Sequence, residues 1–340
     1  MDYINHKFIP DLDLYYRNNL NLAKDLCEEI KRCKCDSIKI AMCVQNPVDK
    51  YSELKDQWID PEGIQHSDSL FNTFEKRLVT KENAKYFASY ISETFKFSMV
   101  SIYDHESVKI CKNFFNCAKI PSNNLNNFPL IQEIANEFNN IIIDTKKTNK
   151  NSLLKVLEFI KKCNKDINIA IQFSPSRPPA KSNKWNLDSI KYLKNEFKEY
   201  NPIVGLSEHS NSIDQSLIAI GLGASFIEKG IMPDYEYENG DSDSAHCIPI
   251  SHFREWHTKI IDGFSGIGCY EELSENIFPE NVRLFFRKDM KKGEKITIDD
   301  IYCKFSDRGS NGIQFESFIN KKLLNSVLLD QPVSIEDVCS

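Results

Sequence analysis

The sequence predicts an α/β fold: a (β/α)8 TIM barrel followed by a small, mainly β domain. Short apolar runs alternate with amphipathic stretches over about the first 265 residues, which is typical of parallel α/β folds. Eight such runs within about 260 residues match the usual size of this barrel. After residue 282 the pattern changes to short strand-like runs separated by turn residues.

The eight expected strands are the apolar runs of this alternation. They lie at residues 7–9, 37–42, 97–102, 117–120, 141–144, 167–173, 203–206 and 224–228. Helical spacing of apolar residues is clear at 20–30 and 82–95. A doubly wound open sheet is the alternative, but it would normally carry a nucleotide fingerprint after its first strand. The chain contains neither G-x-G-x-x-G nor a P-loop sequence.

Residues 45–80 interrupt the alternation with Pro47, Trp58, Pro61 and Gly63. We expect a long strand-to-helix loop there. In a barrel such loops build sites at the C-terminal face, although a plain surface insertion explains the segment equally well. The predicted organisation is a barrel over residues 1–265, a linker over 266–282 and a small domain over 283–340.

Composition narrows the class of protein. With 41% hydrophobic and 27% charged residues, the chain is globular in composition. Its net charge of -6 disfavours broad nucleic-acid binding. No apolar run approaches the roughly 18 residues of a membrane helix, and the first residues lack a signal-peptide pattern. The 11 cysteines include no C-x-x-C pair. We therefore expect a cytoplasmic protein with reduced thiols.

Two lysines lie inside or at the end of apolar strands. Lys39 and Lys119 must each find an anion or reach water, because burying an unpaired ammonium is costly. Together they could bind a phosphate or a carboxylate, although structural ion pairs with neighbouring strands explain them as well. His209 follows another apolar run and could be a base, a metal ligand or a core histidine. His246 has no informative spacing to it.

Several segments in order carry a family resemblance. They are residues 119–130 (KIPSNNLNNFPL), 204–210 (VGLSEHS) and 223–229 (GASFIEK), followed by 289–297 (DMKKGEKIT) and 308–313 (RGSNGI). With these segments the chain resembles the sialic acid (N-acetylneuraminate) synthase family over nearly its whole length. That family joins a (β/α)8 barrel to a C-terminal antifreeze-like (SAF) domain.

The resemblance implies an activity. Family members condense phosphoenolpyruvate with an N-acylated hexosamine such as N-acetylmannosamine, giving a nonulosonic acid and phosphate. They use a divalent metal, Mn2+ or Mg2+, as a Lewis acid that polarises the sugar aldehyde. The partners so implied are these two substrates and a second copy of the chain in a domain-swapped homodimer.

The resemblance also assigns roles to residues. His209 matches a metal-binding histidine, Asp243 a sugar-binding acid, and Arg308 an SAF-domain arginine that reaches the acyl group of the sugar in the neighbouring subunit's active site. The implied substrate-binding set is Lys39, Ser101, Lys119, Ser122, Arg177, Ser207, Asp243 and Arg308.

Some positions depart from the family pattern. The second metal histidine falls at Gly230, which has no side-chain ligand. The acidic residue expected after Ser122 falls at Asn124, and the glutamate near the first strand's end falls at Asp11. We take Asp11 and Asn124 as the catalytic candidates. Further departures are Ala41, Asp144, Pro175, Arg177 and the run Tyr16-Arg17-Asn18.

Three hypotheses remain. The chain is an active synthase in which His246, Asp234 or Asp11 supplies a metal ligand and Arg177 takes over an anion contact. Alternatively it is a catalytically inactive or re-purposed paralogue that binds a sugar or a partner, which Gly230 and Asn124 favour. The third hypothesis is an enzyme of the same fold that uses another aldehyde or another three-carbon donor.

Overall fold

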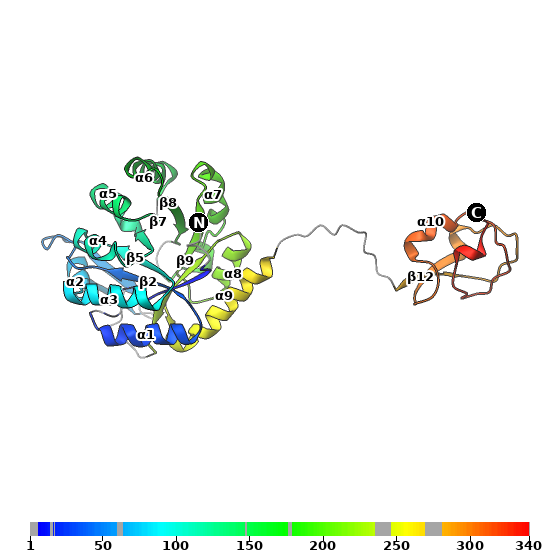
Figure 1. Ribbon diagram of the computed structural model, residues 1–340, viewed down its shortest axis with the longest axis horizontal. Helices are drawn as coiled ribbons and strands as arrows, with labels where there is room; N and C mark the ends of the chain where they lie inside the picture. The colour runs from blue at the N-terminus through cyan, green and yellow to red at the C-terminus, as the bar shows by residue number, and fades with distance from the viewer. Residues whose placement is uncertain are drawn as a thin grey trace. The chain divides into compact units, whose positions relative to one another are not determined.

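The computed structural model describes residues 6–13, 16, 18–59, 64–146, 148–175, 179–234, 246–268 and 281–339. The chain divides into two compact units, Met1–Gly268 and Cys269–Ser340. The first is a ring of parallel strands with helices around it, and the second is a small domain of short strands and turns (Figure 1). The predicted fold class is confirmed.

Eight parallel strands form the barrel, in the ring order β1-β2-β5-β6-β7-β8-β9-β10. Their bounds are β1 (Phe8–Asp11), β2 (Ser37–Met42), β5 (Phe97–Ile102), β6 (Cys117–Ile120), β7 (Asn140–Asp144), β8 (Asn168–Phe173), β9 (Ile203–Glu208) and β10 (Ile227–Met232). The ring closes because β1 pairs with both β2 and β10. The two-residue strand β11 (Ile248–Pro249) also pairs with β10.

One strand lies later than expected. Strand β10 begins at Ile227 and continues to Met232, whereas the apolar run predicted residues 224–228. The stretch before it still belongs to the turn after a helix, where Gly223 has a φ of +95°. Lys229 and Gly230 interrupt the apolar pattern although both belong to the strand.

Helices cover the outside of the ring. They are α1 (Leu20–Arg32), α3 (Lys81–Thr94), α4 (His105–Cys111), α5 (Phe128–Glu137), α6 (Lys150–Cys163), α7 (Ser189–Glu196), α8 (Asp214–Gly221) and α9 (Phe253–Ile267). Helix α1 shows why they form: the Asn19 side chain accepts a hydrogen bond from the Leu22 amide at its start. Four of its apolar residues, Ala23, Leu26, Cys27 and Ile30, are buried against the barrel core, and Leu20 and Leu22 are partly buried there.

Side chains alternate along each strand between the helix-facing core and the barrel interior. Ile38 and Ile40 of β2 belong to the helix-facing core, so Lys39 between them points inward. An apolar cluster fills the part of the barrel interior that lies nearer the amino ends of the strands, and we call this cluster the floor of the barrel. It consists of Ile9, Phe97, Met99, Cys117, Ile142, Ala170 and Phe226, with Ile203 partly buried against it.

The insertion after β2 has a structure of its own. It forms an antiparallel hairpin, β3 (Lys55–Ile59) and β4 (Gln65–Ser69), followed by the short helix α2 (Leu70–Glu75). The expected long loop therefore contains two strands and a helix. Ser69 begins α2 by accepting a hydrogen bond from the Asn72 amide.

The small unit is built from the antiparallel strands β12 (Val282–Phe286) and β13 (Ile301–Phe305), the helix α10 (Phe315–Phe318) and several 3-10 turns. Its core holds Leu284, Phe286, Met290, Ile296, Ile301, Phe318, Leu323, Val327, Val333 and Val338. Thr297 and Ser334 each precede a 3-10 turn with a capping box, closed by Asp300 and Asp337 respectively.

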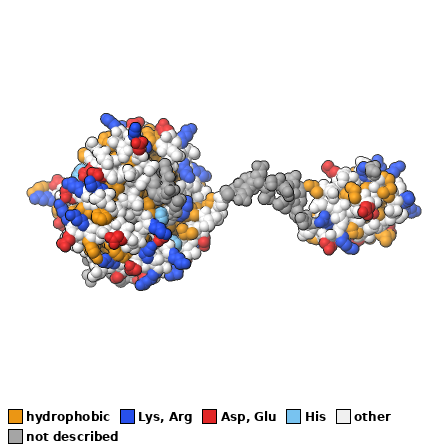
Figure 2. Space-filling view, viewed as in Figure 1, with side chains coloured by type: hydrophobic (Ala, Val, Ile, Leu, Met, Phe, Trp, Pro, Cys, Tyr) orange, Lys and Arg blue, Asp and Glu red, His pale blue; other side chains and the backbone are white. Residues whose placement is uncertain are grey.

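Within the described residues, no helix combines the length and the apolar character needed to cross a membrane. Acidic and basic side chains are interspersed on the face of the barrel unit seen in Figure 2, with no large patch of one sign.

Candidate functional site

A layer of polar side chains lies directly above the apolar floor of the barrel. Most of its members follow a floor residue by two positions on the same strand, toward the carboxyl end, where TIM-barrel sites are built. The layer consists of Asp11, Lys39, Ser101, Lys119, Asp144, Gln172, Ser207 and Glu228, all of them buried. Buried charges are costly unless they are paired, so the pairings within this layer determine what it can bind.

Lys119 and Glu228 form the central ion pair of the layer. Lys119 Nζ lies 2.6 Å from Glu228 Oε1, and the Ser207 hydroxyl donates to the same oxygen over 3.1 Å. Lys39 Nζ lies 3.9 Å from it. Burial alone would raise the pKa of Glu228, but the two lysines outweigh burial and hold this pKa at about 2. Glu228 is therefore a carboxylate at neutral pH.

Asp11 is the second carboxyl group of the layer. Its Oδ2 lies 2.5 Å from Lys39 Nζ. Burial raises the pKa of Asp11 to about 7, and the nearby charges of Glu228 and Asp13 add to that effect, while Lys39 and Lys119 offset it only in part. Asp11 is thus able to take up or release a proton near neutral pH, as general acid–base catalysis requires.

Asp144 adds a third carboxyl group, at the end of β7. The Ser174 hydroxyl donates to its Oδ1 over 2.7 Å, and Lys119 Nζ lies 3.5 Å from its Oδ2. Two lysines therefore face three carboxyl groups in this layer. An anionic ligand is held best when one of these carboxyl groups is protonated, and the raised pKa of Asp11 makes it the candidate.

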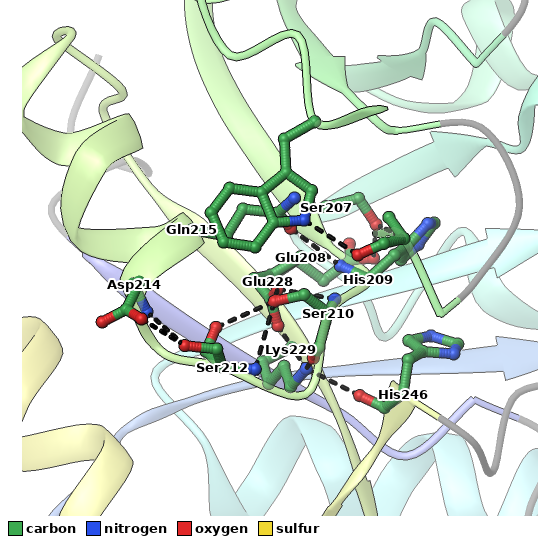
Figure 3. A network of polar contacts seen from close by, with 12 residues as sticks. Ser207, Glu208, His209, Ser210, Ser212, Asp214, Gln215, Glu228, Lys229 and His246 are labelled. Atoms are coloured by element: carbon green, nitrogen blue, oxygen red, sulfur yellow. Dashed lines mark hydrogen bonds and ion pairs between the residues drawn. The ribbon is translucent and has the colours of Figure 1, made fainter. Parts of the chain in front are cut away.

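His209 and His246 face each other at the edge of the layer (Figure 3). Their ring centroids are 4.7 Å apart and their planes meet at 63°. Because Ser207 gives its only hydroxyl proton to Glu228, His209 Nε2 is the donor in its 3.1 Å contact with Ser207. His209 Nδ1 therefore carries a lone pair. Burial is the main cause that lowers the pKa of both histidines. Interaction with His246 and with nearby lysines lowers the pKa of His209 further, and nearby lysines lower that of His246, so both rings are neutral at pH 7.

Gly230 and Cys247 share one small space beside these histidines. A Cβ atom built at Gly230 would lie 2.3 Å from Cys247 Sγ. Cys247 is buried, so its side chain occupies the place that any side chain at position 230 would need. The described part of the chain holds no group of three or more His, Cys, Asp or Glu side chains placed to bind a metal.

The polar layer opens into a cavity of about 1160 Å³. The hairpin β3–β4 contributes Trp58, whose ring stacks on His66 with centroids 5.3 Å apart. Within the described residues, Trp58 Nε1 is buried and has no hydrogen-bond partner. The basic side chains that line the cavity are Lys39, Arg77, Lys119, Lys146, Lys181 and Lys184.

The structure brings together seven of the residues predicted as catalytic, substrate-binding or metal-binding. Asp11, Lys39, Ser101, Lys119, Ser122, Ser207 and His209 all line the cavity. Asn124 is not among its lining residues, and its side-chain amide donates to the Ile102 carbonyl over 3.4 Å. Arg308 is exposed in the small unit. Arg177 and Asp243 lie outside the described residues.

His246 and Asp234, the two residues after β10 that were proposed as alternative metal ligands, lie in different surroundings. His246 lies against His209 in the cavity wall. Asp234 is exposed, and its Oδ1 accepts a hydrogen bond from the Ser251 amide over 3.0 Å.

Sequence reasoning named neither Glu228 nor Trp58 as a site residue. A carboxylate at the end of the apolar run predicted at 224–228 was the available signal for Glu228, since a buried charge needs a partner.

Much of the chain, including most of this site, matches a known protein family. Residues 26–268 match the family described as the NeuB family. This chain belongs to the NeuB family. The matched segment contains most of the barrel, including the polar layer from Lys39 to Glu228 and both facing histidines. The predicted resemblance is confirmed at the level of the family.

Individual proteins extend the likeness beyond the barrel. An N,N'-diacetyllegionaminic acid synthase of Campylobacter jejuni is 27% identical, over 92% of this chain and 94% of its own. A pseudaminic acid synthase of the same organism is 26% identical, over 92% and 91%. A solved structure titled putative spore coat polysaccharide biosynthesis protein E, from Chromobacterium violaceum, covers 98% of this NeuB-family chain and 99% of its own, with a TM-score of 0.71 at 16% identity.

Proposed function

We propose that this protein is a synthase that condenses phosphoenolpyruvate with an N-acylated hexosamine, giving a nonulosonic acid and phosphate. The observation that carries the proposal is the placement of Lys39 and Lys119, which both project into the base of one cavity and contact the same carboxylate oxygen of Glu228. Such a pair suits a ligand that carries both a phosphate and a carboxylate. The names of the two Campylobacter relatives, a diacetyllegionaminic acid synthase and a pseudaminic acid synthase, support this class of product.

The reaction forms one carbon–carbon bond. C3 of phosphoenolpyruvate attacks the aldehyde carbon of the open-chain sugar, water adds to C2, and phosphate leaves with its bridging oxygen, so that a 2-keto acid remains. Lys39 and Lys119 would hold the anionic groups of the donor, and this positioning supplies much of the rate. Asp11, with its pKa near 7, would exchange the protons that these steps require.

A divalent metal, Mn2+ or Mg2+, belongs to the proposal. When bound, it would polarise the sugar aldehyde as a Lewis acid. The residues fit such an ion in one respect: His209 carries a buried Nδ1 with no hydrogen-bond partner among the described residues. The proposal also includes a domain-swapped homodimer in which Arg308 of one chain contacts the sugar bound by the other.

A second candidate is a non-catalytic member of the family that binds a sugar or a partner. Asn124 favours it, because its amide is directed to the Ile102 carbonyl and an amide exchanges no protons near neutral pH. The same synthase fold acting on another aldehyde or another three-carbon donor is a variant of the main proposal.

The deciding experiment is phosphate release from phosphoenolpyruvate by the full chain. The assay uses Mn2+ or Mg2+ and a panel of hexosamines with one or two acetamido groups, including N-acetylmannosamine. Release that requires both metal and sugar supports the synthase, and the best sugar identifies the acceptor. No release with any sugar, from folded protein that still binds phosphoenolpyruvate, favours the non-catalytic candidate.

A further inference from the structure

We propose that His246, from the segment after β10, is the second protein ligand of a divalent cation that His209 holds. No residue of β10 itself then serves as a ligand. The inference rests on the proposed function for the role of the cation, but the site is argued from geometry and is tested by metal binding alone.

The separation of the two rings fits one shared ion. With a metal–nitrogen bond of about 2.1 Å, each ring centroid would lie about 3.2 Å from a shared ion. Two such ligands at right angles, as in an octahedral site, place their centroids about 4.6 Å apart. The observed separation is 4.7 Å. Both rings also keep a buried Nδ1 without a hydrogen-bond partner among the described residues.

The hydrogen bonds of His209 match the pattern that is usual for a metal-binding histidine. Its Nε2–H donates to Ser207, which in turn donates to Glu228. A metal-binding histidine usually gives its second N–H to such a partner, which fixes the tautomer and the ring orientation. His209 Nδ1 is left with its lone pair inside the cavity wall.

The space around Gly230 explains why the second imidazole comes from elsewhere. Asp11 and Gly230 are register partners on neighbouring strands, so position 230 lies at the level of the polar layer. A side chain there is blocked by Cys247 Sγ. His246 immediately precedes this cysteine, and the arrangement that puts the thiol beside Gly230 also puts the imidazole beside His209.

Lys229 fixes the segment that carries His246. Its ammonium group donates to the carbonyl oxygen of His246 over 2.6 Å and to that of Ser210 over 2.5 Å, and it pairs with Glu208. All of these groups are labelled in Figure 3. Lys229 is fully buried, with Nζ 4.8 Å from the centroid of the Trp256 ring. Lys229 is thus a positioning residue, because it ties the backbone beside His209 to the backbone of His246.

The number of protein ligands suits a catalytic ion rather than a structural one. Structural sites are usually closed by four protein ligands, while catalytic sites keep positions open for water or substrate. Counting only the described part of the chain, two imidazoles would leave most positions of an octahedral ion open. Imidazole ligands also favour Mn2+ over Mg2+ here, because Mg2+ prefers oxygen donors.

The test measures Mn2+ binding to the full chain, without turnover. After removal of metal with a chelator, we expect one Mn2+ per chain by titration, and pulsed EPR on protein labelled with 15N-histidine should show two coupled imidazole nitrogens. His209→Ala and His246→Ala should each weaken binding at least about 100-fold. His252→Ala is the matched control, because His252 is exposed and does not line the cavity. It should bind as the unaltered protein does.

A rescue variant tests the proposed exchange of positions. His246→Ala combined with Cys247→Ala and Gly230→His frees the space beside β10 and places an imidazole there, so Mn2+ binding should return. Where a variant fails to fold, the nitrogen count on the unaltered chain decides. The inference would be overturned by coupling of Mn2+ to a single histidine or by the absence of Mn2+ binding. Full Mn2+ binding by folded His246→Ala would overturn it as well. Tight two-histidine binding without phosphate release would instead count against the proposed function alone.

Discussion

Lys119 Nζ lies 2.6 Å from Glu228 Oε1, although 109 residues separate them in the sequence. Both side chains are buried, at 4% and 3% exposure. We predict that Lys119→Met lowers the free energy of unfolding by about 3–5 kcal/mol, because it leaves a buried carboxylate without its main partner. Urea unfolding followed by tryptophan fluorescence measures this, since Trp58, Trp185 and Trp256 all belong to the barrel unit.

The double variant Lys119→Met/Glu228→Gln separates stability from binding. Removing the unpaired charge should recover most of the lost stability, while phosphoenolpyruvate binding should stay at least 10-fold weaker than in the unaltered protein. Calorimetric titration of the ligand provides the second measurement. If the double variant binds phosphoenolpyruvate normally, Lys119 does not hold the anion.

Asp11 should make anion binding depend on pH around neutrality. Its pKa is raised to about 7, so the cavity gains a negative charge as the pH rises from 6 to 8. We predict that sulfate, whose charge is constant over this range, binds several-fold more weakly at pH 8 than at pH 6. Asp11→Asn should bind sulfate equally at both values. An unchanged pH dependence in that variant would assign the effect to another group.

The same group predicts the sign of a change in stability. The folded pKa of Asp11 lies above the ordinary value of 3.8, so folding favours its protonated form. Its contribution to stability is fully present below about pH 4 and is lost as the pH rises toward 7. The free energy of unfolding should therefore fall less from pH 5 to pH 8 in Asp11→Asn than in the unaltered protein. Urea unfolding at both pH values measures this difference.

Gly230 should tolerate no side chain while Cys247 is in place. A Cβ atom there would lie 2.3 Å from Cys247 Sγ, so Gly230→Ala should cost about 1–3 kcal/mol of stability. Adding Cys247→Ala should restore most of it. Gly266→Ala, in α9 with nothing within 4 Å of the new atom, is the control and should not destabilise. Thermal unfolding compares the four proteins, and a Gly230→Ala variant as stable as the unaltered protein would contradict the packing of Cys247 against Gly230.

Trp58 should act on the acceptor rather than on the donor. It lines the cavity from the hairpin, and its indole N–H has no partner among the described residues. Trp58→Phe removes one hydrogen-bond donor, so KM for the amino sugar should rise about 5- to 10-fold while KM for phosphoenolpyruvate stays the same. Tyr51→Phe, an exposed residue of the same insertion, is the matched control. An equal rise in both KM values would place Trp58 elsewhere in the reaction.

The periodicity of the chain by itself determined the barrel. Strands buried on both sides must be apolar runs, and the helices between them must be amphipathic, so both types of element are visible locally. The same argument located Lys39 and Lys119, because a charged residue in an apolar strand must find a partner. The apolar pattern predicted β10 too early, at residues 224–228. Lys229 and Gly230 break the apolar run, although the strand continues through them.

Only the tertiary structure decided which of these residues meet. Closure of the ring brings Glu228 to Lys119, and the return of the chain after β10 sets His246 against His209 and Cys247 against Gly230. Distance along the sequence carries no information about such contacts, because they depend on how strands and loops are arranged in space. The sequence therefore determined the fold and which residues need a partner, and the folded chain decided which partner each of them meets.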